Sequence, residues 1–161
     1  MELLRSTNIV ESVVESSSLT IGTFDGMHIG HNHLIKEMLN SAHKNNVPSV
    51  VVTFRPNPFI VLNNLEKSQY HLMRPSQKYN LLESMGVDYI YELSFDREMS
   101  ELSAEDFLYK FILNPFNPKD IVVGYDHHFG KGREGDALFL SKHKDKNSYS
   151  LSVVDAYKVN D

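Results

Sequence analysis

Short apolar runs alternate with a helical pattern near the start of the chain, and this order most constrains the fold. The run at 18–21 stops at Gly22, as a buried strand does. Apolar residues then recur with the helical period over 30–43, and a β-branched run follows at 49–54. Because two strands joined by a helix are normally parallel neighbours, this segment predicts a parallel sheet.

The same alternation continues through the rest of the chain. The further predicted elements are a helix from Pro75 to Gly86, a strand at 87–93, a helix that follows a capping box at Ser103 and Asp106 and ends at Asn114-Pro115, and strands at 121–123 and 151–154. The charged residues 142–146 are interpreted as a solvated turn. Strands that alternate with helices predict an α/β fold, an open, mostly parallel sheet with helices on both faces.

Composition excludes several classes of protein. With 161 residues, the chain has the length of a single domain. It contains no cysteine, which excludes disulfides, a thiol nucleophile and thiolate metal sites. A net charge of −5 disfavours general binding to nucleic acid or to an anionic membrane. No apolar run approaches the roughly 20 residues that span a bilayer, and no secretory signal is recognised, so a cytoplasmic protein is predicted.

Three loops follow predicted strands, at 22–31, 55–59 and 124–136. Since the carboxyl ends of parallel strands meet at one edge of a sheet, we expect these loops to lie along the same edge. Ligands of open α/β sheets bind outside that edge, near the point where strand order reverses. The three loops are therefore the predicted binding region.

The first loop runs directly from a strand into a helix and has the features of an anion site. Glycines at 22, 26 and 30 allow a sharp turn and a close approach of the backbone to a ligand. The following helix presents unpaired N–H groups, and His28 and His31 can both donate to phosphate oxygens. Two alternatives remain open from the residues alone. The loop is an ordinary turn with capping histidines, or His28, His31 and His33 form a structural zinc site.

Three motifs carry a family resemblance: GTFDGMHIGH at 22–31, VVTFRPNP at 51–58 and GYDHHFGKGREGD at 124–136. In this order and spacing they resemble the N-terminal, FMN adenylyltransferase module of bacterial bifunctional riboflavin kinase/FAD synthetases, in the nucleotidyltransferase superfamily. The resemblance covers nearly the whole chain and implies a Rossmann-like nucleotidyltransferase fold.

The resemblance also implies an activity. The family transfers the adenylyl group of ATP to the phosphate of FMN, which gives FAD and pyrophosphate without a covalent enzyme intermediate. ATP and FMN are then the expected partners, with no nucleic acid or membrane. Mg²⁺ is expected to accompany ATP, held by phosphates and waters rather than by protein ligands. His28 and His31 are the expected catalytic residues, which stabilise the transferring and leaving phosphates.

Further site residues follow from the same resemblance. The expected nucleotide-binding residues are Gly22, Thr23, Phe24, Asp25, Gly26, Gly30, Gly124 and Asp126. The expected FMN-binding residues are Thr53, Phe54, Pro56, Asn57, Pro58, Phe129 and Gly130. An alternative role for Asp25 is to cap the turn that follows it. Two positions depart from the family pattern, because Asn57 stands where His is common and His127 where Phe is usual.

In the family, this region is followed by a Ser-Ser-x-x-Ile-Arg segment that contacts the nucleotide phosphates, and then by a riboflavin kinase module. Neither is recognised here. The expectation is therefore a single nucleotidyltransferase domain over 1–161, truncated at its C-terminus and lacking the kinase. Two alternative functions stay open. One is a nucleotide- or flavin-binding domain with weak or no turnover, and the other is a nucleotidyltransferase for another phosphorylated acceptor.

Overall fold

The computed structural model describes residues 1–6, 11–26, 29–66 and 73–155. Its centre is a six-stranded sheet with the order β1-β4-β3-β2-β5-β6, in which every neighbouring pair is parallel. The strands are β1 (Glu2–Ser6), β2 (Ser17–Ile21), β3 (Ser49–Arg55), β4 (Tyr89–Ser94), β5 (Pro118–Gly124) and β6 (Ser150–Val154). The predicted α/β fold with a parallel sheet is confirmed.

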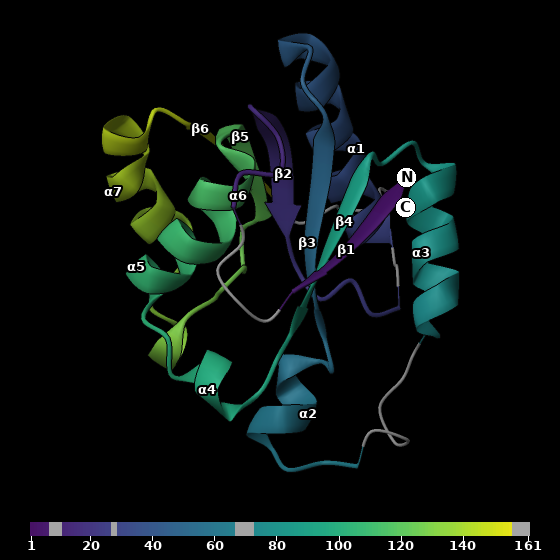
Figure 1. The fold of residues 1–161 in the computed structure, drawn as a ribbon, viewed down its shortest axis with the longest axis vertical. Coiled ribbons are helices and arrows are strands. Elements are labelled where there is room, and N and C mark those ends of the chain that lie inside the picture. Colours follow the sequence, from purple (N-terminus) through teal and green to yellow (C-terminus); the bar gives the residue numbers. More distant parts are fainter. Residues whose placement is uncertain (7–10, 27–28, 67–72, 156–161) are drawn as a thin grey trace.

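Helices cover both faces of this sheet (Figure 1), with α1 and α3 on one side and α5, α6 and α7 on the other. The helical elements are α1 (Ile29–Asn45), α2 (Pro58–Leu62), α3 (Pro75–Ser84), α4 (Arg97–Ser100), α5 (Ala104–Phe107), the π-helix η2 (Leu108–Leu113), α6 (Asn114–Phe116), the 3-10 helix η3 (Lys131–Arg133) and α7 (Ala137–Asn147). None of the helices in the described part of the chain has the length and apolar character needed to cross a bilayer.

Alternation along the central strands divides the core into two layers. Val51 of β3 belongs to a buried cluster with Met38 of α1 and Leu82 of α3. The next residue, Val52, belongs to the opposite cluster, with Phe107 of α5. Successive side chains of a strand point to opposite faces, so the continuous β-branched run of β3 is buried on both.

Several elements are absent from the sequence-based expectations or differ from them, and the short helices α2 and α4 are among those not predicted. The strand β1 is not predicted, because it is a short edge strand in which only Leu3 and Leu4 pack against the core. The predicted turn at 142–146 is wrong, since these residues lie inside α7. Asp136 caps that helix by accepting a hydrogen bond from the Phe139 amide (2.8 Å), and Leu140 is fully buried. The charged residues lie mainly on the solvent side.

The predicted end of a helix at Asn114-Pro115 is also wrong. Helical backbone continues through Phe116 and ends at Asn117, which adopts the left-handed conformation with φ 38° and ψ 61°. The preceding turn is a π-helix, in which the Asn114 amide donates to the carbonyl five residues earlier. Because Pro115 has no N–H to donate, a wide turn before it accommodates the ring without losing a regular hydrogen bond.

Strand order reverses between β2 and β5. From β2 the chain adds β3 and β4 on one side, and then crosses back to place β5 on the other side of β2. The register pairs Thr20 with Val122, so Gly22 and Gly124 lie two residues further along adjacent strands. In parallel sheets this is the position at which ligands bind, so the first and third predicted loops flank the expected crevice.

Candidate nucleotide-binding site

The loop after β2 turns sharply around a buried aromatic ring. Phe24 has a φ of +51° and is only 1% exposed, and its ring packs in the core. A Cβ atom at Gly22 would lie 2.9 Å from the Phe24 ring. Glycine is therefore required at this position by a close contact within the loop rather than only by a ligand. The predicted role of Phe24 is limited to its backbone.

The helix α1 follows this loop and is long enough to present a strong N-terminal dipole. Gly30 and His31 lie in its first turn, and the His31 ring meets the Phe24 ring edge-on at a centroid distance of 5.4 Å. Unpaired amides and the dipole favour an anion at such a terminus. Gly26, at φ +67°, supplies the last described turn before the helix. The predicted catalytic residue His28 lies outside the described residues.

The second loop contacts the first through Asn57. Its Nδ2 atom donates to Asp25 Oδ2 at 2.6 Å, and its Oδ1 atom accepts from the Phe59 amide at 2.9 Å. Asn57 is thus the N-cap of α2, and Pro58 is the first residue of that helix. The Arg55–Pro56 peptide is cis. Both loops lie at one edge of the sheet, as the sequence predicts.

Lys78 of α3 joins the same group of residues and is absent from the sequence-based set. Its side chain is 6% exposed, and Nζ donates to the Thr23 carbonyl (3.1 Å) and to Thr53 Oγ1 (3.3 Å). Nζ also lies 3.6 Å from Asp25 Oδ1. A signal exists in the sequence, because Lys78 precedes Leu82 by four positions and therefore lies on the apolar face of its helix.

Burial and the neighbouring carboxylates shift the pKa of Lys78 in opposite directions. Burial lowers the pKa of Lys78, and the nearby carboxylates of Asp25 and Glu92 partly offset that effect. Glu92 of β4 is 5% exposed and accepts a hydrogen bond from Arg5 at 3.1 Å. A lysine in this position is stabilised by its partners, because an isolated buried ammonium would be strongly unfavourable.

The third loop begins at Gly124 and continues over the other face of the sheet. Asp126 is exposed just after β5, the strand that pairs with β2. Gly130, at φ +77°, lies against Ala104, whose backbone nitrogen would be 2.8 Å from a Cβ atom at this position. Side chains larger than hydrogen are therefore excluded at Gly130. Its close approach to α5 fixes where the loop crosses that helix.

Two residues predicted to bind FMN, Phe54 and Phe129, both pack against the ring of Phe107, which is not among the predicted site residues. Phe107 of α5 lies 5.9 Å from Phe54 and 5.3 Å from Phe129, measured between ring centroids. Phe54 and Phe129 are 9% and 7% exposed, so their rings form a packed wall rather than open faces. Thr53 precedes Phe54, is fully buried, and its hydroxyl accepts a hydrogen bond from Lys78.

His127 is the second departure from the family pattern. Its ring lies 5.7 Å from that of Phe129, and its Nε2 atom is buried without a hydrogen-bond partner. Burial, with a smaller contribution from His128, lowers the pKa of His127 to about 4. A neutral imidazole thus stands at position 127, where the family pattern has the phenyl ring of phenylalanine.

Metal ligation by the protein is sparse in the part of the chain that the structure describes. There, no group of three or more His, Asp or Glu side chains is arranged to hold a metal ion. Asp25 is already engaged by Asn57 and Lys78, whereas the Asp126 carboxylate is exposed. The donor set fits a cation held mainly by phosphates and waters, with Asp126 as the carboxylate available to it.

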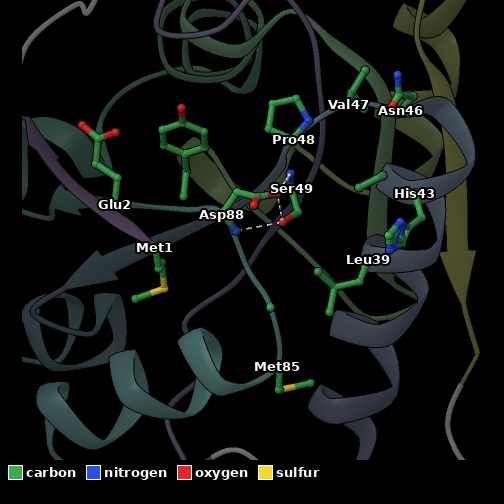
Figure 2. A pocket seen from close by; sticks show the side chains of 13 residues that line it. Met1, Glu2, Leu39, His43, Asn46, Val47, Pro48, Ser49, Met85 and Asp88 are labelled. Atoms are coloured by element: carbon green, nitrogen blue, oxygen red, sulfur yellow. Dashed lines mark hydrogen bonds between the residues drawn. The ribbon is translucent and has the colours of Figure 1, made fainter.

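Hollows occur at both ends of the sheet. A small one of about 20 Å³ lies at the carboxyl end, with Asp25, Asn57, Lys78 and Glu92 among its lining residues. A wide one of about 840 Å³ lies at the opposite end, where β1, β3 and β4 begin. Figure 2 shows the wide hollow, with Asp88 hydrogen-bonded to Ser49 in its wall. Four of the predicted residues, Asp25, Phe54, Pro56 and Asn57, line the small hollow, and none of those that the structure describes lines the wide one.

Comparisons with known proteins bear on this site. A family model described as FAD synthetase matches residues 10–161. The chain is 37% identical over 143 residues to the "Bifunctional riboflavin kinase/FMN adenylyltransferase" of Escherichia coli (strain K12), a match that covers 88% of this chain and 45% of that protein. It is 31% identical over 137 residues to the protein of the same description from Listeria monocytogenes, with coverage of 85% and 43%. The chain thus spans less than half the length of these relatives.

A solved structure gives the same picture of the fold. A crystal structure described as a macrolide-efflux protein from Streptococcus pneumoniae matches with a TM-score of 0.85 and 28% identity. The match covers 98% of this chain and 51% of that one. With the family model matching nearly the whole chain and the expected loops meeting at one sheet edge, the chain belongs to the FAD synthetase family.

Proposed function

We propose that this chain transfers the adenylyl group of ATP to FMN, giving FAD and pyrophosphate. The observation that carries the proposal is the glycine-bounded turn after β2, which leads into the N-terminus of α1 at the point where strand order reverses. Family membership and the relatives described as FMN adenylyltransferases support the choice of substrates. The cysteine-free composition fits a reducing, cytoplasmic compartment.

In the proposed reaction, a phosphate oxygen of FMN attacks the α-phosphorus of ATP. The new P–O bond forms as the bond to the β-phosphate oxygen breaks, and pyrophosphate leaves. Catalysis then depends on positioning and on stabilising negative charge. We assign that stabilisation to His31, to His28 and to the amides around Phe24 and Gly30. Mg²⁺ bound with ATP would supply further positive charge, and the exposed Asp126 carboxylate would be its contact with the protein.

We assign FMN to the side of the crevice bounded by the second loop and the aromatic wall. Asn57 and Asp25 bond to each other across the two loops, so the acceptor and nucleotide sides have a fixed connection. Phe54 and Phe129 would bound the acceptor side through their packing on Phe107. We assign Thr53, Pro56, Pro58 and Gly130 to the backbone that shapes this side, and Gly22, Thr23, Gly26 and Gly124 to the nucleotide side.

The direct test is incubation of the purified chain with FMN and Mg·ATP, followed by measurement of FAD and pyrophosphate. Formation of both in equal amounts supports the proposal. Binding of both substrates without pyrophosphate release would instead favour the non-catalytic binding domain. Pyrophosphate released only with another phosphorylated acceptor would favour a different nucleotidyltransferase, and stoichiometric zinc in the purified protein would favour the histidine metal site.

His31→Ala should lower kcat for FAD formation by about 10²–10³, because one preorganised donor to the reacting phosphates is lost. Steady-state kinetics with Mg·ATP and FMN measure this effect. His33→Ala is the matched control, since a residue two positions along a helix faces a different direction, and we expect its kcat to stay within about threefold of the unmodified chain. Equal losses in both variants would contradict the assigned role of His31.

A further inference from the structure

Lys78 contacts the loop after β2 and the end of β3, and Asp25 connects it to the loop at 55–59. Its ammonium group is bonded to the Thr23 carbonyl of the nucleotide loop and to the Thr53 hydroxyl at the end of β3. It also pairs with Asp25, which in turn accepts from Asn57. One buried side chain of α3 therefore contacts the end of β2, the end of β3 and, through Asp25, the start of α2.

The surroundings of Lys78 exclude a purely solvent-facing role. The side chain is 6% exposed and lies on the face of α3 that also carries the fully buried Leu82. Lysine is among the residues least often buried, and a buried ammonium is maintained only by its partners. Each donor contact that it makes is to a residue of the candidate site.

Removal of the ammonium leaves its partners with other bonds. The Thr53 hydroxyl still donates to the Thr23 carbonyl at 3.1 Å, and Asp25 still accepts from Asn57 at 2.6 Å. The Thr23 carbonyl, the Thr53 hydroxyl and the Asp25 carboxylate would each keep one hydrogen bond, whereas Asp25 Oδ1 would lose its cation, so the variant should fold with reduced stability. The connection that would be lost is the one between the Asp25 carboxylate and the Thr23–Thr53 pair.

We propose that Lys78 is a positioning residue that holds the loop after β2 at a fixed separation from the end of β3, which leads into the loop at 55–59, and so aligns the two substrates without touching either. This inference rests on the proposed function. Alignment of reacting groups is sensitive to small movements, and a misplacement of about 1 Å can lower a rate by about 10². The expected consequence is a loss of turnover without a comparable loss of binding.

The test compares the unmodified chain with Lys78→Met, which keeps the length of the stem and removes the charge. We expect kcat for FAD formation to fall by about 10–10². The KM for ATP should change by less than about threefold, since the groups assigned to phosphate binding are retained. Leu82→Met is the matched control, because it alters packing one turn later on the same face of α3 without reaching the loops. Its kcat should be unchanged.

A second measurement separates this inference from the proposed function. Hydrogen–deuterium exchange of peptides that cover 22–26 and 53–57 should be faster in Lys78→Met than in the unmodified chain or in Leu82→Met. If the unmodified chain forms no FAD, the proposed function fails, yet faster exchange would still support the positioning role. Unchanged exchange, an unchanged kcat, or a loss of kcat that Leu82→Met shares would each overturn it.

Discussion

Two buried charged side chains, Lys78 and Asp120, bond to different parts of the molecule. Asp120 of β5 is 4% exposed and accepts hydrogen bonds from Ser41 of α1 (2.6 Å) and from Ser150 (2.8 Å) and Ser152 (3.2 Å) of β6. Those donors belong to regular elements on and beside the sheet. The contacts of Lys78 go instead to the loop after β2 and to the end of β3.

The difference separates stability from site geometry. β6 is an edge strand with mostly exposed or half-buried side chains, and the Asp120 carboxylate joins it to β5 and α1. Loss of that carboxylate would remove the common acceptor of three hydroxyl groups. Loss of the Lys78 ammonium would leave its partners bonded to one another. We therefore expect the aspartate to affect unfolding and the lysine to affect turnover.

Asp120→Ala should have the largest effect of the substitutions that test this difference. We expect it to lower the free energy of unfolding by about 3 kcal/mol, because the hydrogen bonds of three hydroxyl groups to a buried charged group are lost. For a domain of this size that is a fall in Tm of roughly 6–12 °C, measurable by thermal unfolding. Asp120→Asn keeps an acceptor oxygen and should lose less. A reduced kcat in the folded fraction of Asp120→Ala would contradict the separation.

Much of the fold can be predicted from the chain because its central strands are strongly patterned. The runs that became β2 and β3 are buried on both faces and are bounded by Gly22 and by proline-rich sequence, so their type and order follow from local signals. The elements that sequence analysis misses have weak signals. α7 has Leu140 as its one fully buried side chain among charged residues, and the edge strand β1 offers two adjacent leucines.

The candidate site divides in the same way. Local sequence patterns predict the parallel strands, and parallel topology in turn brings the three loops to one edge of the sheet. The contacts within the site do not follow, because Asp25, Asn57 and Lys78 come from separate elements and meet only through tertiary packing. Asn57 illustrates the limit. In sequence it is a replacement for a chargeable histidine, whereas in the structure it caps α2 and binds Asp25.

His127 extends the comparison to a buried titratable group whose Nε2 atom has no partner. Its pKa is lowered to about 4 in the fold, against about 6.5 in an unfolded chain. Between these values the unfolded state binds more protons, so the free energy of unfolding should fall as pH drops from 6.5 toward 4. We expect a loss of about 2 kcal/mol, less than full burial implies because part of the residue is accessible.

His127→Phe should remove that part of the pH dependence and raise stability at neutral pH by about 1 kcal/mol, since an unsatisfied polar atom is replaced by hydrocarbon. Denaturant unfolding at several pH values between 4 and 7 measures both effects. His43→Gln is the control, because His43 is exposed in α1 and its replacement leaves the buried ring and its neighbours in place. Parallel pH curves for His127→Phe and the unmodified chain would show that the ring is not the source.

The smallest effects concern the serines that donate to Asp120, and they test whether that carboxylate acts through each bond separately. Ser150 Oγ lies 2.8 Å from the carboxylate and Ser152 Oγ lies 3.2 Å from it. We expect Ser150→Ala to lower the free energy of unfolding by about 1 kcal/mol and Ser152→Ala by about 0.5 kcal/mol, as shorter bonds are the stronger ones. Both losses should largely vanish when the substitution is made in Asp120→Ala, because the acceptor is already gone. Equal losses in the two backgrounds would mean that the serines stabilise β6 by packing, and the carboxylate would then no longer explain how the edge strand is held.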